Sequence, residues 1–101
     1  MTVIYEICWF DSASSEKART HIKRKRSDAA QSAIYTTARD MVASWAGLDT
    51  RWGWDFMREV MAEDISPPPQ GSFRHFEKTL PRGDVLNVLI YRDRAIKGAA
   101  A

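Results

Sequence analysis

The clearest hydrophobic pattern in the chain runs from residue 27 to residue 46 and predicts an amphipathic helix. Apolar residues recur at steps of three and four, as on one face of a helix; they are Ala30, Ile34, Ala38, Met41, Val42 and Trp45, with Leu48 following. Polar positions occupy the other side, at Asp28, Gln31, Ser32, Tyr35, Arg39 and Asp40. Ser27 is the expected N-cap, Asp28 suits the first turn, and Gly47 is the expected left-handed C-cap.

Both ends of the chain instead show the pattern of strands. Residues 2–10 are β-branched and aromatic, and alternation places Val3, Tyr5, Ile7 and Trp9 on one face and Ile4, Glu6, Cys8 and Phe10 on the other. Residues 19–25 predict a second strand with its basic positions on one face. Residues 73–80 and 85–92 flank a turn at 81–84 and predict a β-hairpin.

A second helix, shorter than the first, is expected in the middle of the chain. Residues 49–53 are typical of a connection, and the helix follows on apolar positions Trp54, Met57, Val60, Met61 and Ile65. Ser66 and the three prolines at 67–69 end it, since proline cannot continue a helix. The prolines then predict a stiff, extended linker.

These elements, in the order β-β-α-α-β-β, predict an α+β fold with a single antiparallel sheet and two helices packed on one face. The 101 residues form one domain, 1–101, in which Gly98–Ala101 is a frayed tail. The expected core includes Ile34, Met41, Trp45, Val88 and Ile90. The strand order stays open at this stage.

The charge is distributed unevenly, although the formal net charge is only +2. Residues 1–26 carry a balance of +3, residues 27–65 of −4 and residues 66–101 of +3. If the sheet is single, both basic segments lie in it and the acidic segment covers its back, which makes the molecule dipolar. No segment resembles a membrane helix or a signal peptide, and one cysteine, Cys8, cannot form an intramolecular disulfide. A cytoplasmic setting is therefore expected.

A run of basic residues at the second strand is the first candidate contact site. It consists of Lys23, Arg24, Lys25 and Arg26. A solvated edge strand explains it equally well, because edge strands use lysine to prevent unwanted pairing. Nucleic-acid binding on the sheet face away from the helices is the alternative, with cations for phosphates and rings for bases; its residues are Arg19, His21, Lys23, Lys25, Phe10 and Tyr91. That face is expected to show Ile4, Cys8, Phe73, His75 and Leu89 as well.

Two further candidate contact sites lie in the middle of the chain. Trp52 and Trp54 flank a glycine beside Arg51, and tryptophan is common at binding hot spots, although packing under the proline linker is the other explanation. Glu59, Glu63 and Asp64 form an acidic patch that is either a solvated face or an imitation of phosphates.

The sequence carries no pattern typical of catalysis. Cys8 with His21 or His75 would form a dyad only if their strands were adjacent, and a cysteine between Ile7 and Trp9 is typically an inert packed thiol. Cys and His do not occur at metal-ligand spacings, and no phosphate-binding glycine loop is present. We therefore expect neither an enzyme nor a metal or other cofactor.

In size, aromatic content and absence of catalytic motifs, the chain is similar to the small αβ proteins of phages and mobile elements, anti-CRISPR inhibitors among them. This resemblance assigns no residues, but it implies a non-enzymatic binding protein that occludes a partner by shape and charge. The partner would be another protein or a ribonucleoprotein complex, with no membrane involved. Nucleic-acid binding and a homodimeric interaction module are the alternatives.

Overall fold

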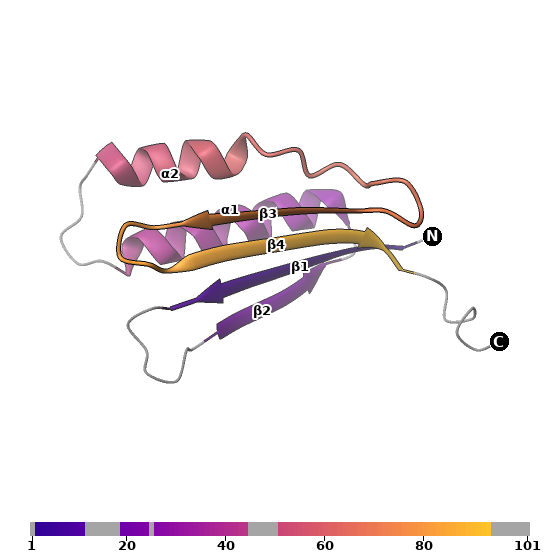
Figure 1. Cartoon of the computed structure of the whole chain (residues 1–101), viewed down its shortest axis with the longest axis horizontal. Coiled ribbons are helices and arrows are strands. Elements are labelled where there is room, and N and C mark those ends of the chain that lie inside the picture. Colours follow the sequence, from indigo (N-terminus) through magenta and orange to yellow (C-terminus); the bar gives the residue numbers. More distant parts are fainter. Residues whose placement is uncertain (1, 12–18, 25, 45–50, 94–101) are drawn as a thin grey trace.

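The computed structural model describes residues 2–11, 19–24, 26–44 and 51–93. Its elements, in chain order, are β1 (Val3–Phe10), β2 (Arg19–Arg24), α1 (Ser27–Ala43), α2 (Arg51–Met61), β3 (Phe73–Thr79) and β4 (Val85–Arg92). The expected α+β class, with an antiparallel sheet and two helices, is confirmed (Figure 1). Gly98–Ala101 and the expected caps beyond residue 44 lie outside the described residues.

The sheet has four strands in the order β2-β1-β4-β3, and every neighbouring pair is antiparallel. Its centre is the pair β1–β4, which joins the two ends of the chain from Val3 opposite Arg92 to Phe10 opposite Val85. Both basic segments therefore belong to one sheet. The lysine- and arginine-rich strand β2 lies at an edge, where such side chains limit pairing with other strands.

Both helices contribute to a core on one face of the sheet. α1 lies behind the strands and α2 runs beside it along the β3 side (Figure 1). The buried cluster combines alternate positions of β1 and β4 with one side of each helix; its largest members include Tyr5, Ile7, Ile34, Met41, Phe56, Leu86 and Ile90. Burial of these apolar side chains is the main force that holds the layers together. The other face of the sheet is covered by none of the described elements.

Burial alternates with the expected period of two in β3 and β4, and in β1 except at Ile4, which is 8% exposed although it lies on the face away from the helices. Tyr5 and Ile7 of β1 are fully buried, and so are Leu86, Val88 and Ile90 of β4. In β3, positions 74, 76 and 78 are half-buried whereas 73, 75, 77 and 79 are exposed. The predicted assignment of residues to the two faces is thereby confirmed for β1 and β4.

The boundaries of α1 differ from the expectation at both ends. The N-cap is Arg26, in extended conformation and without a side-chain cap, so the prediction of Ser27 is wrong. Instead, Asp28 accepts a hydrogen bond from the Ala29 N–H (2.8 Å). This bond satisfies one of the backbone N–H groups of the first turn that have no partner within the helix. The helix ends at Ala43 with Ser44 as its C-cap, and the Ser44 hydroxyl donates to the Met41 carbonyl (2.6 Å). Trp45, Gly47 and Leu48 lie outside the described residues.

The prediction for the second helix is wrong at its start, its end and one position of its apolar face. The Trp52–Trp54 tripeptide belongs to the first turn of α2 instead of a connection, and the helix ends at Met61, before Ser66. Residues two apart on a helix are rotated by about 200°. Trp52 consequently packs against the core while Trp54 is 70% exposed, and the buried positions are Gly53, Phe56 and Val60.

Candidate binding surface

The sheet face away from α1 and α2 is the candidate binding surface, which we call the open face. Its described side chains come from three strands: Ile4, Glu6, Cys8 and Phe10 of β1, Val85, Asn87, Leu89 and Tyr91 of β4, and Phe73, His75, Glu77 and Thr79 of β3. β2 adds register positions at its edge, since Phe10, Cys8 and Glu6 are opposite Arg19, His21 and Lys23. The sequence predicted the central members of this face correctly.

An apolar row crosses one end of the open face, where β3 begins and β4 ends. Phe73 pairs with Tyr91, which pairs with Ile4 on its other side. Phe73 is 66% exposed, a large fraction for an aromatic residue in a strand. Tyr91 is half-buried and Ile4 is 8% exposed, so Phe73 is the main exposed apolar side chain of this row.

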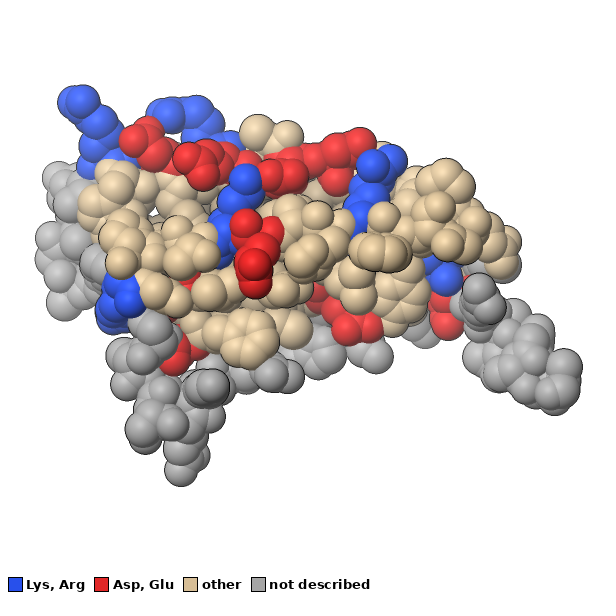
Figure 2. All heavy atoms as spheres, viewed as in Figure 1, with Lys and Arg blue, Asp and Glu red and all other residues tan. Residues whose placement is uncertain are grey.

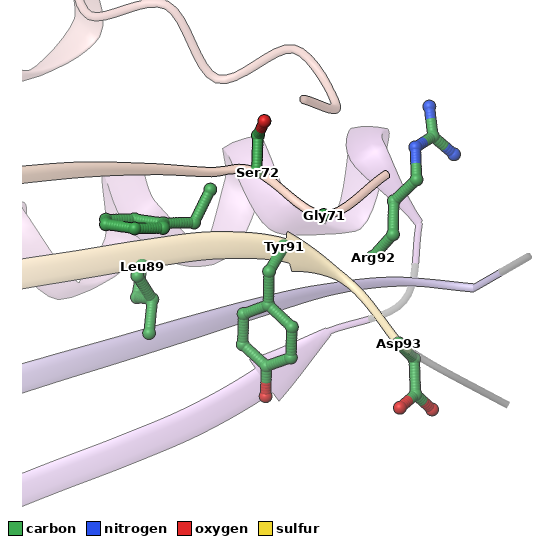
Figure 3. Close-up of a pocket in the computed structure, with 7 residues that line it drawn as sticks. Gly71, Ser72, Leu89, Tyr91, Arg92 and Asp93 are labelled. Carbon is green, nitrogen blue, oxygen red and sulfur yellow. The ribbon is translucent and has the colours of Figure 1, made fainter. Parts of the chain in front are cut away.

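A shallow pocket of about 560 Å³ opens at this row. It is lined by Gly71, Ser72, Phe73, Leu89, Tyr91, Arg92 and Asp93. Leu89, Tyr91 and Asp93 point to the same side of the sheet, whereas Arg92 points to the other (Figure 3). The Arg92 Nε–H donates to the Pro68 carbonyl (2.8 Å), so the guanidinium is held on the helix side.

Carboxylates lie close to the Tyr91 hydroxyl. The hydroxyl donates a hydrogen bond to Glu6 from the neighbouring strand β1. This hydrogen bond, together with burial and the charges of Glu6 and Asp93, raises the pKa of Tyr91 to about 12. The hydrogen bond to Glu6 and burial are the main causes of the shift, and the nearby charges of Glu6 and Asp93 add to it because negative charge disfavours the phenolate.

The polar side chains in the middle of the open face bond to one another. The ring Nε2 of His75 lies 3.2 Å from Asn87 Oδ1, and the Asn87 amide donates to Glu77 (3.5 Å). His75 is separated from Cys8 by strand β4. Cys8 and His21 are register partners on adjacent strands, but the described side chains do not include His21. Within the described ranges, no three His, Cys, Asp or Glu residues form a group that could hold a metal ion.

The basic residues predicted as a contact site are divided between the two faces of the sheet. Lys23 is the register partner of Glu6 on the open face, whereas Arg24 is opposite Tyr5 on the helix face. There the exposed Arg24 lines a groove with Ser32, Thr36 and Asp40 of α1. Arg26 is exposed at the start of α1, and Lys25 lies outside the described residues.

The remaining predicted contact residues lie on the opposite side of the molecule, along α2. Arg51, Trp54 and Glu59 are exposed on this helix, and Trp52 is half-buried. Figure 1 shows α2 and β2 at opposite margins, so these sites do not form one surface with the basic edge.

Two of the three residues of the acidic patch are paired with cations, whereas Glu59 is exposed on α2. Glu63 forms an ion pair with Lys78 (2.6 Å) and Asp64 with Arg74 (3.4 Å), and both acids follow the end of α2. Figure 2 shows this row of acidic side chains along one edge with basic side chains beside it. The cations come from the helix face of β3. Alternation directs Arg74 and Lys78 of β3 toward these acids, so the basic residues of this strand face the acidic segment that lies behind the sheet.

The sequence interpretation placed Leu89 on this face but missed Asp93, which also lines the pocket. The signal was present, because Leu89, Tyr91 and Asp93 are two residues apart and a strand places such positions on one face. No sequence pattern predicted that Gly71 and Ser72 line the pocket, because their position depends on the path of the segment between α2 and β3.

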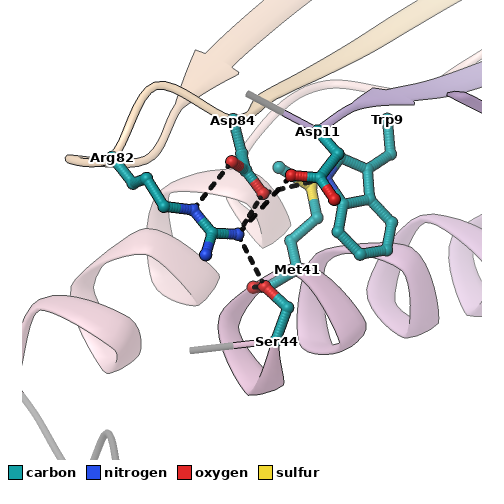
Figure 4. Close-up of polar contacts among 6 residues, drawn as sticks. All are labelled: Trp9, Asp11, Met41, Ser44, Arg82 and Asp84. Atoms are coloured by element: carbon teal, nitrogen blue, oxygen red, sulfur yellow. Dashed lines mark hydrogen bonds and ion pairs between the residues drawn. The ribbon is translucent and has the colours of Figure 1, made fainter. Parts of the chain in front are cut away.

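A second polar cluster joins the β3–β4 turn to α1 and is structural (Figure 4). Asp84 is fully buried and accepts hydrogen bonds from Trp9 Nε1 (3.0 Å), Arg82 Nε (3.1 Å) and Arg82 Nη2 (2.9 Å). Arg82 also donates to the Ser44 hydroxyl (3.0 Å) and lies 3.8 Å from Asp11. The bidentate pair of Arg82 and Asp84 orients the Arg82 guanidinium, and its bond to Ser44 holds the β3–β4 turn against the end of α1.

No helix in the described part of the chain is long and apolar enough to cross a membrane. A scan against models of protein families, a search of curated proteins and a search of solved structures each found no match to this chain.

Proposed function

We propose that this chain is a non-enzymatic binding protein that uses its open face to cover part of another protein. The observation that carries this proposal is the exposed ring of Phe73 beside Tyr91 at an open pocket, on the side of the sheet that no described element covers. Aromatic side chains of this kind contribute large contact area with little loss of conformational freedom. The partner would be occluded by shape and charge, without a chemical step.

The arrangement of the polar side chains supports binding over catalysis. His75, Asn87 and Glu77 are joined in one line on a flat strand surface, and Tyr91 is bonded to Glu6. Side chains that form hydrogen bonds with one another in this way keep the surface rigid. A rigid surface is suited to recognition, since less entropy is lost when the partner binds.

Charge favours a protein over a nucleic acid as the partner. The described part of the open face carries the carboxylates Glu6, Glu77 and Asp93, whereas the described arginines and lysines of β3 and β4 lie on the helix face. Carboxylates repel phosphates at short range. Binding of a nucleic acid along the basic edge strand β2 is the second candidate, favoured by the register positions of Arg19, His21 and Lys23.

A small inhibitor of the kind carried by phages, anti-CRISPR proteins included, would act by such occlusion. Chain length and composition alone support this narrower proposal. A homodimer formed through the open face is a further outcome that the experiment below distinguishes.

Affinity capture from a lysate of the source cells, with and without nuclease, tests the proposal. We expect Phe73→Ser and Leu89→Lys to abolish recovery of a specific protein, because both lie in the apolar part of the open face. Trp54→Ser, the matched control on α2, should leave recovery unchanged. Recovery that depends on Lys23, Arg24 and Lys25, and is lost on nuclease treatment, would replace this proposal by the nucleic-acid one. Recovery unaffected by all of these changes would refute the open face as the site.

A further inference from the structure

We propose that the pocket at the end of the open face takes a basic side chain, arginine or lysine, presented by the protein partner. We call it the cation pocket and define it by Phe73, Leu89, Tyr91 and Asp93. The inference rests on the proposed function, because it names the chemistry that this surface recognises.

The shape and lining of the cation pocket suit the stem of a long basic side chain. Phe73 is directly opposite Tyr91, Leu89 is the next residue of β4 on the same face, and the pocket is open to solvent along the sheet. Arginine and lysine place their methylene stems on apolar surfaces while the charged group stays near water. A cation close to an aromatic face gains further attraction from the ring quadrupole, about 0.5–1 kcal/mol at exposed sites.

The charges around the cation pocket select a positive group. Asp93 lines the pocket and points to the same side as Tyr91 (Figure 3). Within the described ranges no arginine or lysine forms an ion pair with Asp93, and its neighbour Arg92 is held on the other face by the Pro68 carbonyl. Glu6 adds a second carboxylate at the Tyr91 hydroxyl.

Space for the incoming group is present at the lip of the pocket. Gly71 has a φ of +87° and would meet nothing within 4 Å if it carried a Cβ, so the backbone beside the pocket is open. A phosphate or carboxylate ligand would face the Asp93 carboxylate, while the Arg92 guanidinium at the rim is held on the helix side by the Pro68 carbonyl. A purely apolar ligand would leave the Asp93 carboxylate partly desolvated and unpaired, which costs free energy.

NMR titration of the whole chain with two short peptides tests the inference. The probe is acetyl-Leu-Arg-Leu-amide, and the control replaces arginine by citrulline, which is neutral and nearly the same shape. We expect the arginine peptide to shift the resonances of Phe73, Leu89 and Tyr91 and to bind roughly 5- to 10-fold more tightly, from one exposed ion pair and one cation–π contact. Equal binding of the two peptides, or shifts confined to other residues, would overturn the inference.

Matched variants locate the charge selectivity. Asp93→Asn should weaken the arginine peptide by about 2- to 5-fold and leave the citrulline peptide unchanged. Asp28→Asn, an exposed acid on α1, should change neither peptide. Phe73→Leu keeps an apolar side chain but removes the ring, and should reduce the preference for arginine over citrulline. If Asp93→Asn leaves that preference intact, the assigned role of the carboxylate is wrong.

Other occupants give distinct results. Shifts of the same resonances by a mixed oligonucleotide, or by dilution of the chain alone, would indicate a nucleic acid or a second copy and would overturn the inference. The outcome is separable from the proposed function. If Phe73→Ser abolishes protein capture but the peptides bind equally, the function stands and the cation pocket fails. If Phe73→Ser has no effect on capture, the proposed function fails as well.

Discussion

Replacement of the buried Asp84 by alanine should destabilise the fold through one identifiable group, the indole N–H of Trp9. Asp84 is 0% exposed, and its Oδ2 accepts the hydrogen bond of Trp9 Nε1 at 3.0 Å (Figure 4). In Asp84→Ala the N–H keeps its place beside Met41 and the sheet but has no acceptor. An unsatisfied buried donor costs about 1–3 kcal/mol. Arg82 lies at the surface and regains water, so it adds little to this cost.

We therefore expect Asp84→Ala to lower the free energy of unfolding by about 2–3 kcal/mol, including the loss of the charge-assisted bond. Asp84→Asn keeps an acceptor oxygen of similar position and should lose only about 1 kcal/mol. For a domain of this size, each kcal/mol corresponds to a change in Tm of about 4–8 °C. The alanine variant should thus melt well below the asparagine variant.

Urea unfolding followed by tryptophan fluorescence measures these differences, and a double-mutant cycle isolates the contact. Trp9→Phe removes the N–H without removing the ring that packs on the core. If the N–H is the cause, Asp84→Ala should cost about 1–2 kcal/mol less in the Trp9→Phe background than in the natural one. A cost below about 0.5 kcal/mol for Asp84→Ala, or a coupling energy near zero, would refute the reasoning.

Three further predictions test the faces, the electrostatics and the turn. Ile90→Ala, at a fully buried position, should lower the free energy of unfolding by about 2–5 kcal/mol. The neighbouring Leu89→Ala on the open face should lower it by less than about 1 kcal/mol. Equal losses for the two variants in urea unfolding would contradict the assignment of faces. The pKa of Tyr91, raised to about 12, lies above its unfolded value of 10.0, so its contribution to stability is complete below pH 10 and is lost as the pH rises toward 12. Glu6→Gln should lower this pKa toward 10.0, measured as phenolate absorbance against Tyr91→Phe, and an unchanged titration would exclude Glu6 as the main cause. Gly83→Ala should destabilise the hairpin by about 1–2 kcal/mol, since its φ of +107° disfavours a Cβ, and an unchanged Tm would show that the turn relaxes.

The β3–β4 hairpin shows which features local sequence patterns predict correctly. Val85–Arg92 and Phe73–Thr79 match the expected strands within a residue, because period-two alternation and the turn residues between them are properties of short segments. The helix boundaries were less predictable. α1 has its C-cap at Ser44, three residues before the glycine from which the sequence predicted the end of the helix. Trp54 looked like a core residue by spacing, but the neighbouring Gly53 and Phe56 fit against α1 instead.

The sequence by itself determined the fold class, the elements and which side chains of each strand share a face, since these depend on propensity and periodicity along a few residues. The tertiary structure alone decided the strand order β2-β1-β4-β3, which brings Glu6 beside Tyr91 across 85 positions of the chain. It also paired Arg74 and Lys78 with the acids that follow α2 and left the open face with carboxylates and aromatic rings. Such pairings depend on which segments meet in three dimensions, and the free energy that selects them comes from burial of the whole core.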